Sequence, residues 1–116
     1  MTGCAGGLSG GLYAFRNARL VPGAAFVLDA VGFDRRARAA HLVITGEGRL
    51  DDQTLAGKAV GEVAERCRRA GIPCHAVVGE AALDRAAVGR LGLAGVTEAS
   101  TLDELAAEGR RLAGAG

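Results

Sequence analysis

The sequence predicts an α/β fold in which helices flank a parallel sheet. Short apolar runs at 41–45, 74–78 and 94–97 are typical of buried strands. Patterns of helical spacing separate these runs, around Val60 to Cys67 and from Asp84 to Leu91. Strands that alternate with helices in this way form βαβ units, whose strands run parallel. Three strands make a thin sheet, so we expect the chain to be incomplete or to pair with another polypeptide.

The amino-terminal part differs in composition from the rest of the chain. Five glycines crowd residues 2–11, and this segment is expected to open a helix before Pro22 interrupts the pattern. Between Ala24 and Ala40 the apolar residues recur at helical spacing, which predicts a helix with a break at Gly32. A glycine-rich helical lead-in therefore precedes the first predicted strand.

Signals for the ends of helices support the remaining elements. Gly71 follows the predicted helix around Val60 to Cys67, at the position where a left-handed glycine ends helices. Gly92 does the same for the helix that starts at Asp84. Thr101 and Glu104 form a capping box, which predicts the start of the final helix.

Bulk composition excludes several classes of function. A chain of 116 residues suffices for one domain-sized core. The formal net charge is +1 and there are only four aromatic residues, so neither a nucleic-acid partner nor a membrane surface is expected. No apolar run approaches the roughly 18 residues that cross a bilayer. Three cysteines without a metal-binding pattern favour a reducing, cytoplasmic setting.

The most informative stretch follows the first predicted strand and reads GEGRLDDQTLAGK over residues 46–58. We expect a tight glycine turn that carries three carboxylates, an arginine and a lysine, with a helix after it. Ligands of open α/β sheets bind at the carboxyl ends of strands, where such turns lie. The mixture of charges suits a phosphate–magnesium site better than an apolar pocket.

Two common glycine-loop motifs do not fit this stretch. A dinucleotide fingerprint beginning at Gly46 would need its third glycine at Asp51, where a carboxylate repels pyrophosphate. A Walker A motif ending at Lys58 would need a glycine at Asp52 and a serine or threonine at Ala59. The local chemistry therefore has to be interpreted residue by residue.

Four of the charged residues can take part in phosphoryl transfer, which needs positioning and charge neutralisation. Glu47 and Asp51 are the nearest carboxylates for Mg²⁺, which binds one or two carboxylates together with phosphate oxygens. Arg49 can clamp a carboxylate or phosphate through two N–H groups. Lys58 can reach a phosphate, and free N–H groups over residues 54–57 can receive an anion.

Structural explanations remain open for the same residues. Asp51 or Asp52 can simply cap the following helix, Arg49 and Glu47 can form a surface pair, and Lys58 can be solvated.

The histidines and cysteines are expected to be structural. His41 and His75 each lie next to a strand without a partner at ligand spacing. Cys67 and Cys74 are expected to fill core space, because their neighbours give no sign of thiolate activation.

The pattern over residues 46–58 resembles the signature of the glycerate kinase family, bacterial enzymes that transfer the γ-phosphate of ATP to D-glycerate, most often giving 2-phosphoglycerate. The glycine-rich segment 6–12, the helix 27–34 and the strand 42–45 resemble the family as well. The resemblance implies a flavodoxin-like α/β domain with a second α/β domain inserted into it and the active site between them. This chain would correspond to the C-terminal third of such an enzyme.

The resemblance also implies a division of the chain and a set of site residues. Residues 1–23 would be a glycine-rich remnant of the inserted domain, and residues 24–116 part of the flavodoxin-like domain. ATP and Mg²⁺ would be the cofactors and D-glycerate the substrate. The implied catalytic residues are Glu47, Arg49 and Asp51, with Glu47 and Asp51 also binding the metal, and the implied substrate- and phosphate-binding residues are Gly46, Gly48, Gln53, Thr54 and Lys58.

These residues make only half a site, which leaves several functions open. The chain could act with a partner that supplies the missing N-terminal portion, or associate with itself. It could also be a truncated or split-enzyme module without catalysis of its own, or a simple binder of phosphate or nucleotide.

Overall fold

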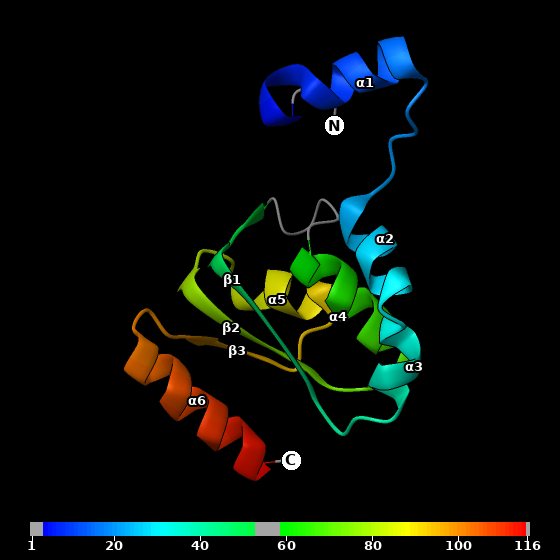
Figure 1. The fold of residues 1–116 in the computed structure, drawn as a ribbon. Coiled ribbons are helices and arrows are strands. Elements are labelled where there is room, and N and C mark those ends of the chain that lie inside the picture. The colour runs from blue at the N-terminus through cyan, green and yellow to red at the C-terminus, as the bar shows by residue number, and fades with distance from the viewer. Residues whose placement is uncertain (1–3, 53–58, 116) are drawn as a thin grey trace.

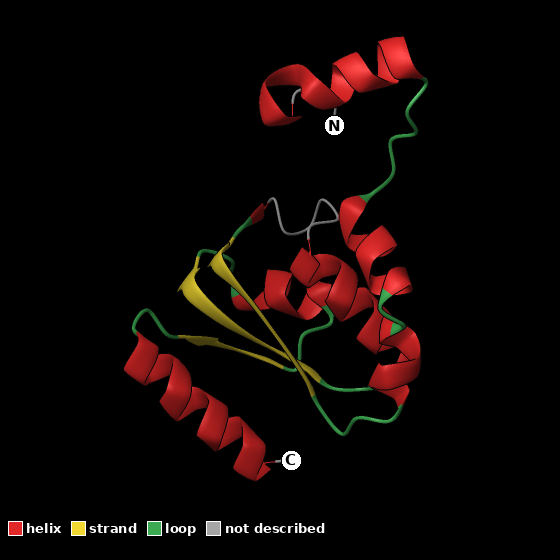
Figure 2. Cartoon of the chain, viewed as in Figure 1, coloured by secondary structure: helices red, strands yellow, loops and turns green. Residues whose placement is uncertain are grey.

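The computed structural model describes residues 4–52 and 59–115, and it confirms the alternation of strands and helices (Figure 1). The sheet has three strands, and helices lie on both of its faces (Figure 2). In chain order the elements are η1 (Cys4–Gly7), α1 (Leu8–Arg16), α2 (Gly23–Ala30), α3 (Phe33–Arg38), β1 (Val43–Leu50), α4 (Ala59–Ala70), β2 (Cys74–Ala81), α5 (Arg85–Leu91), β3 (Gly95–Glu98) and α6 (Leu102–Ala115).

The three strands form one parallel sheet in the order β1-β2-β3. Val43 pairs with Cys74 at the start of β1, and His75 pairs with Gly95 between β2 and β3. The predicted α/β fold with a parallel sheet is therefore confirmed. Within residues 4–52 and 59–115, no helix is long and apolar enough to cross a membrane.

The strands are longer than the sequence pattern predicts, and this corrects the expected glycine turn. The first strand was expected at 41–45 but runs to Leu50, so the residues from Gly46 to Arg49 lie in a strand. The second strand likewise continues beyond Val78 to Ala81. Both extensions arise because the two segments pair with each other along their whole length, which local glycine content cannot reveal.

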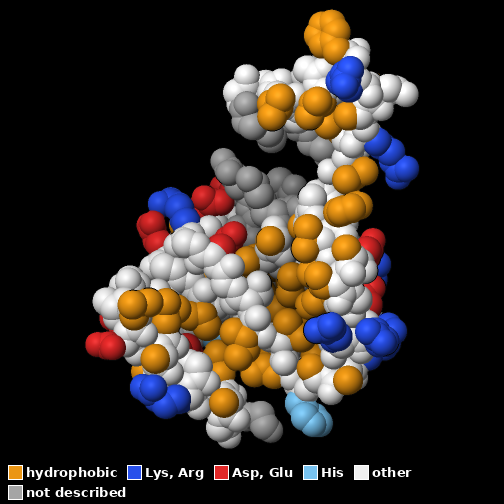
Figure 3. Space-filling model, viewed as in Figure 1, with side chains coloured by type: hydrophobic (Ala, Val, Ile, Leu, Met, Phe, Trp, Pro, Cys, Tyr) orange, Lys and Arg blue, Asp and Glu red, His pale blue; other side chains and the backbone are white. Residues whose placement is uncertain are grey.

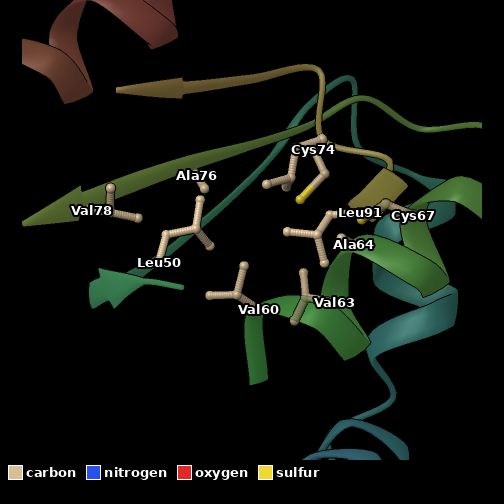
Figure 4. Packing of buried hydrophobic residues seen from close by; sticks show 10 residues of the cluster. Leu50, Val60, Val63, Ala64, Cys67, Cys74, Ala76, Val78 and Leu91 are labelled. Atoms are coloured by element: carbon tan, nitrogen blue, oxygen red, sulfur yellow. The ribbon is translucent and has the colours of Figure 1, made fainter. Parts of the chain in front are cut away.

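The core lies between the sheet and α4. Val60, Ala64 and Cys67 on α4 are fully buried against Ala76 and its neighbours on β2 (Figure 4). These are small side chains, so the helix packs close to the strands.

Helix ends follow the predicted signals. Gly71 has a φ of 72°, and Ile72 N–H donates to the Cys67 carbonyl at 2.9 Å, which is a Schellman ending. Gly32, with a φ of 68°, separates α2 from α3 as expected. Thr101 Oγ1 accepts from Glu104 N–H at 3.1 Å, which confirms the cap on that side of the box. The Glu104 carboxylate accepts from Ser100 N–H at 2.7 Å.

A buried arginine joins three of the helices. Arg66 on α4 has a side chain that is 8% exposed. Its Nη1 donates to Asp29 at 2.7 Å and to Asp34 at 3.3 Å, and its Nε donates to Glu62 at 3.0 Å. Its Nη2 donates to the Ala25 carbonyl at 3.3 Å. These contacts fix α2 and α3 against α4, and together they raise the pKa of Arg66 above its usual value.

The other face of the sheet contacts α6 through polar groups. His75 Nε2 lies 2.8 Å from Thr97 Oγ1, and Thr97 Oγ1 donates to Glu108 on α6 at 2.9 Å. His75 and the buried Cys74 are adjacent on β2 and point to opposite faces. Helix α6 therefore covers the face opposite α4.

Helix α1 stands apart from the sheet and its helices (Figure 1). The radius of gyration is 16.1 Å, compared with about 13 Å for a compact chain of this length. Leu8, Leu12 and Phe15 recur at helical spacing on α1, and Phe15 is 86% exposed. The glycine-rich lead-in is helical as predicted, whereas the division at residue 23 stays a prediction.

Candidate functional site

The register of the two longer strands brings charged residues together at their carboxyl ends. Arg49 on β1 is the direct partner of Glu80 on β2. Its Nη1 donates to Glu80 Oε2 at 2.9 Å, and its Nε lies 3.4 Å from Asp51 Oδ2. Figure 3 shows acidic and basic side chains gathered where these strands end. This is the edge of a parallel sheet at which ligands bind.

Glycines allow the two strands to approach closely at this site. A Cβ on Gly46 would lie 2.9 Å from the Val77 carbonyl oxygen, and a Cβ on Gly79 would lie 2.7 Å from the Gly48 carbonyl oxygen. Neither distance is tolerated between a Cβ and a backbone oxygen. Gly46 and Gly79 therefore have a packing role in the structure, Gly79 against the Gly48 backbone. Binding of substrate or phosphate by Gly46 and Gly48 stays a prediction.

The alternation of inward and outward side chains changes at these glycines. Val43 packs on the core and Glu47 is half-buried, so the odd positions of β1 lean toward α4. After Gly48 the buried residue is Leu50, and Arg49 is exposed. The change turns Arg49 outward, where its side chain is 56% exposed.

Carboxylates outnumber cations among the described side chains of this edge. Glu47, Asp51, Glu80 and Glu98 lie near the carboxyl ends of the three strands, and two of them, Asp51 and Glu80, contact the Arg49 guanidinium. The Glu98 carboxylate accepts from Ala81 N–H at 2.9 Å, which ties the end of β3 to β2. Such an edge attracts a cation, and it can receive an anion where Arg49 is exposed.

The predicted magnesium site is of a kind that needs few protein ligands. In the part of the chain that the structure describes, no group of three or more His, Cys, Asp or Glu residues could hold a metal ion. Mg²⁺ needs only one or two carboxylates when waters and phosphate oxygens complete its shell. The predicted binding of Mg²⁺ by Glu47 and Asp51 would be of that kind, and it stays a prediction.

Three of the predicted residues lie outside the described ranges, namely Gln53, Thr54 and Lys58. The alternatives that Asp51 or Asp52 caps the following helix depend on the same stretch. All of these stay predictions.

Sequence reasoning missed two residues that the structure places at the site. Glu80 lies beyond residue 78, where the sequence pattern ends the second strand, and Glu98 lies beyond residue 97, where it ends the third. The sequence could have indicated both residues, because each is a carboxylate near the end of a strand and the carboxyl ends of neighbouring parallel strands meet at one edge of the sheet. That inference required the correct strand lengths.

The histidine and cysteines beside the strands are structural, as predicted. His75 bonds to Thr97, and burial lowers the pKa of His75 below its ordinary value. Cys67 and Cys74 are free thiols in the core. Burial raises the pKa of Cys74 to about 12 and also raises that of Cys67, so neither is an activated thiolate.

A separate pocket of about 610 Å³ lies beside β3 and α5. Its wall is mostly apolar, with Arg85 and Glu98 as its charged members. Glu98 is the one residue that this pocket shares with the charged edge described above. The pocket is therefore not the predicted phosphate site.

Comparisons with known proteins agree on one family. The model of the glycerate kinase family matches residues 1–112. A glycerate kinase of Bacillus cereus is 40% identical over 106 residues, which cover 88% of this chain and 28% of that protein. A glycerate kinase of Halalkalibacterium halodurans is 47% identical over 77 residues, covering 66% of this chain and 20% of that protein.

A solved structure, described as a putative glycerate kinase 2 from Salmonella typhimurium LT2, resembles the fold with a TM-score of 0.58 at 37% identity. The alignment covers 84% of this chain and 24% of that one. The chain thus spans less than a third of the length of the relatives it matches. On the strength of the family match and of the B. cereus relative, the chain belongs to the glycerate kinase family.

Proposed function

We propose that the chain supplies the C-terminal part of a kinase site that transfers the γ-phosphate of ATP to a hydroxyl group of D-glycerate. The observation that carries this proposal is the placement of Arg49 and Asp51 at the carboxyl end of β1, within the segment that matches the family. Relatives named glycerate kinase support the substrate class.

In this reaction a glycerate hydroxyl oxygen bonds to the γ-phosphorus while the bond to the bridging oxygen of ATP breaks. ADP leaves, and the hydroxyl proton is lost. The protein mainly positions the reactants and offsets the charge on the transferring group. Arg49 is proposed to hold the glycerate carboxylate or that group, because a guanidinium binds either through two N–H groups.

The remaining predicted residues complete the proposed half-site. Glu47 and Asp51 would hold Mg²⁺ together with the nucleotide phosphates, and the ion would neutralise phosphate charge. Lys58 would add positive potential. Gly46, Gly48, Gln53 and Thr54 are proposed to contact substrate or phosphate.

A second polypeptide segment is part of the proposal, because the chain spans only 20–28% of the relatives' length. That segment would supply the other side of the site, and residues 1–23 would contact it as a remnant of the inserted domain. A cytoplasmic location is proposed as well, since ATP is found there and the free Cys67 and Cys74 suit reducing conditions.

A chimera tests the proposal. The matching segment of the B. cereus glycerate kinase is replaced by this chain, and ADP release is followed with Mg-ATP and D-glycerate. We expect turnover that depends on D-glycerate. A chimera that folds and binds Mg-ATP but releases no ADP would contradict the proposal.

Arg49→Ala in the chimera tests the role of the arginine. We expect kcat/KM to fall about a hundred-fold, as for loss of a group that stabilises transition-state charge. Arg68→Ala is the matched control, because Arg68 is exposed and pairs with Glu65 on α4. Activity within a few-fold of the parent chimera would remove Arg49 from the mechanism.

Exposed apolar side chains favour a second candidate, a non-catalytic module that acts by association. Leu8 on α1 is 60% exposed, and Phe26 and Val27 on α2 are 62% and 55% exposed. Apolar surface of this kind commonly marks an interaction site. Light scattering of the chain alone should then give a mass above that of the monomer, and a concentration-independent monomer would argue against this candidate.

A further inference from the structure

We propose that Glu80 is a positioning residue for Arg49, an inference that rests on the proposed anion-binding role of Arg49. Neither the predicted site nor the family comparison assigns a role to Glu80. The inference starts from the parallel register of β1 and β2, which makes the two residues direct neighbours across the sheet.

The contact has the geometry of a charge-assisted hydrogen bond. Arg49 Nη1 lies 2.9 Å from Glu80 Oε2, within the range expected for a guanidinium and a carboxylate. The two residues are 31 positions apart in sequence. Glu80 therefore attaches the Arg49 side chain to a strand other than its own, which a neighbour on β1 could not do.

The two carboxylates engage different parts of the guanidinium. Glu80 Oε2 accepts a hydrogen bond from Nη1 at 2.9 Å, whereas Asp51 Oδ2 lies 3.4 Å from Nε, a longer contact. Phosphates and carboxylates bind a guanidinium through two parallel N–H groups. With Nη1 held by Glu80, the orientation of the edge formed by Nε and Nη2 is fixed, and a ligand that binds this edge would replace the longer contact between Asp51 and Nε.

The exposure of the pair argues against a role in stability. The side chains of Arg49 and Glu80 are 56% and 59% exposed, and exposed ion pairs add little to the free energy of folding. The strands are already joined by their backbone ladder on both sides of this position. What the pair determines is the orientation of Arg49.

The test uses the full 116-residue chain labelled with ¹⁵N and inorganic phosphate as the probe. Glu80→Asp keeps the negative charge but shortens the side chain by one methylene, so that the carboxylate no longer reaches Nη1. Glu65→Asp is the matched control, because it makes the same change in the exposed Glu65–Arg68 pair on α4. The readouts are the heteronuclear NOE of the Arg49 Nε–Hε group and its shift on phosphate titration.

We expect Glu80→Asp to lower the Arg49 NOE and to raise the dissociation constant for phosphate about two- to five-fold, the range that an exposed ion pair allows. The control should leave both unchanged. An unaltered Arg49 NOE, or an unaltered phosphate affinity in a chain that binds phosphate, would overturn the inference.

Failure of the proposed function would look different. If the parent chain binds no phosphate at tens of millimolar but the Arg49 NOE still falls in Glu80→Asp, the positioning by Glu80 stands. The proposed anion-binding role of Arg49 would then be the part that fails.

Discussion

The close approach of β1 and β2 predicts that Gly79→Ala will destabilise the protein and disturb the charged edge. The new Cβ would lie 2.7 Å from the Gly48 carbonyl oxygen, a backbone atom that cannot rotate away. Ordinary contact begins at 3.4 Å, so the strands would have to separate by about 0.7 Å, and overpacking of this kind costs about 1–3 kcal/mol. The separation occurs next to the paired residues Arg49 and Glu80.

Urea-induced unfolding followed by far-UV circular dichroism measures the loss. The matched control is Gly89→Ala on α5, where an added Cβ meets nothing within 4 Å. Because alanine is favoured over glycine inside a helix, this control should gain up to about 1 kcal/mol. The two substitutions therefore have opposite expected signs. A Gly79→Ala protein that unfolds at the parent's urea concentration or higher would refute the reasoning.

Three further predictions concern the helices and the buried titratable groups. Arg66→Met should lower the free energy of unfolding by about 2 kcal/mol, because charge-assisted hydrogen bonds are lost. Arg68→Met should change this free energy little. Equal urea midpoints for the two variants would contradict the prediction. Burial lowers the pKa of His75, so the unfolded chain binds the proton first. Stability should therefore fall as the pH drops through the ordinary histidine pKa of about 6.5. His75→Gln should weaken this dependence, and an unchanged pH profile of the urea midpoint would contradict the prediction. Burial raises the pKa of the Cys74 thiol to about 12. This thiol should therefore react with iodoacetamide only as fast as the chain unfolds. Rapid labelling of Cys74 in the native protein at pH 8 would contradict the prediction.

Local signals in the sequence predicted most of the fold. Gly71 and Gly32 marked helix boundaries because left-handed backbone favours glycine, and the structure has both in that conformation. Thr101 marked the start of α6 because its hydroxyl can cap a helix. Such signals act within a few residues, so they are visible in a single chain.

The extent of the strands and the composition of the site depended on contacts far apart in sequence. Glycine disfavours strands locally, and Gly46 and Gly48 therefore suggested a turn. Pairing with β2 makes them part of β1 and brings Glu80 to Arg49. Arg49 and Asp51 were identified from their charges and their position after a strand, but their partners required the register. Lys58 lies outside the described residues, and its role stays a prediction.

The position of β1 at the end of the sheet order has a practical consequence for experiments on the site. No strand among residues 4–52 and 59–115 pairs with its outer side, so its backbone can act as a template for another chain. Charged side chains on such a strand discourage this, and on β1 those are Glu47 and Arg49. The residues proposed to serve phosphoryl transfer therefore also protect the protein from edge-to-edge aggregation. Neutralising them should lower solubility together with activity, and size-exclusion chromatography of each variant separates the two effects.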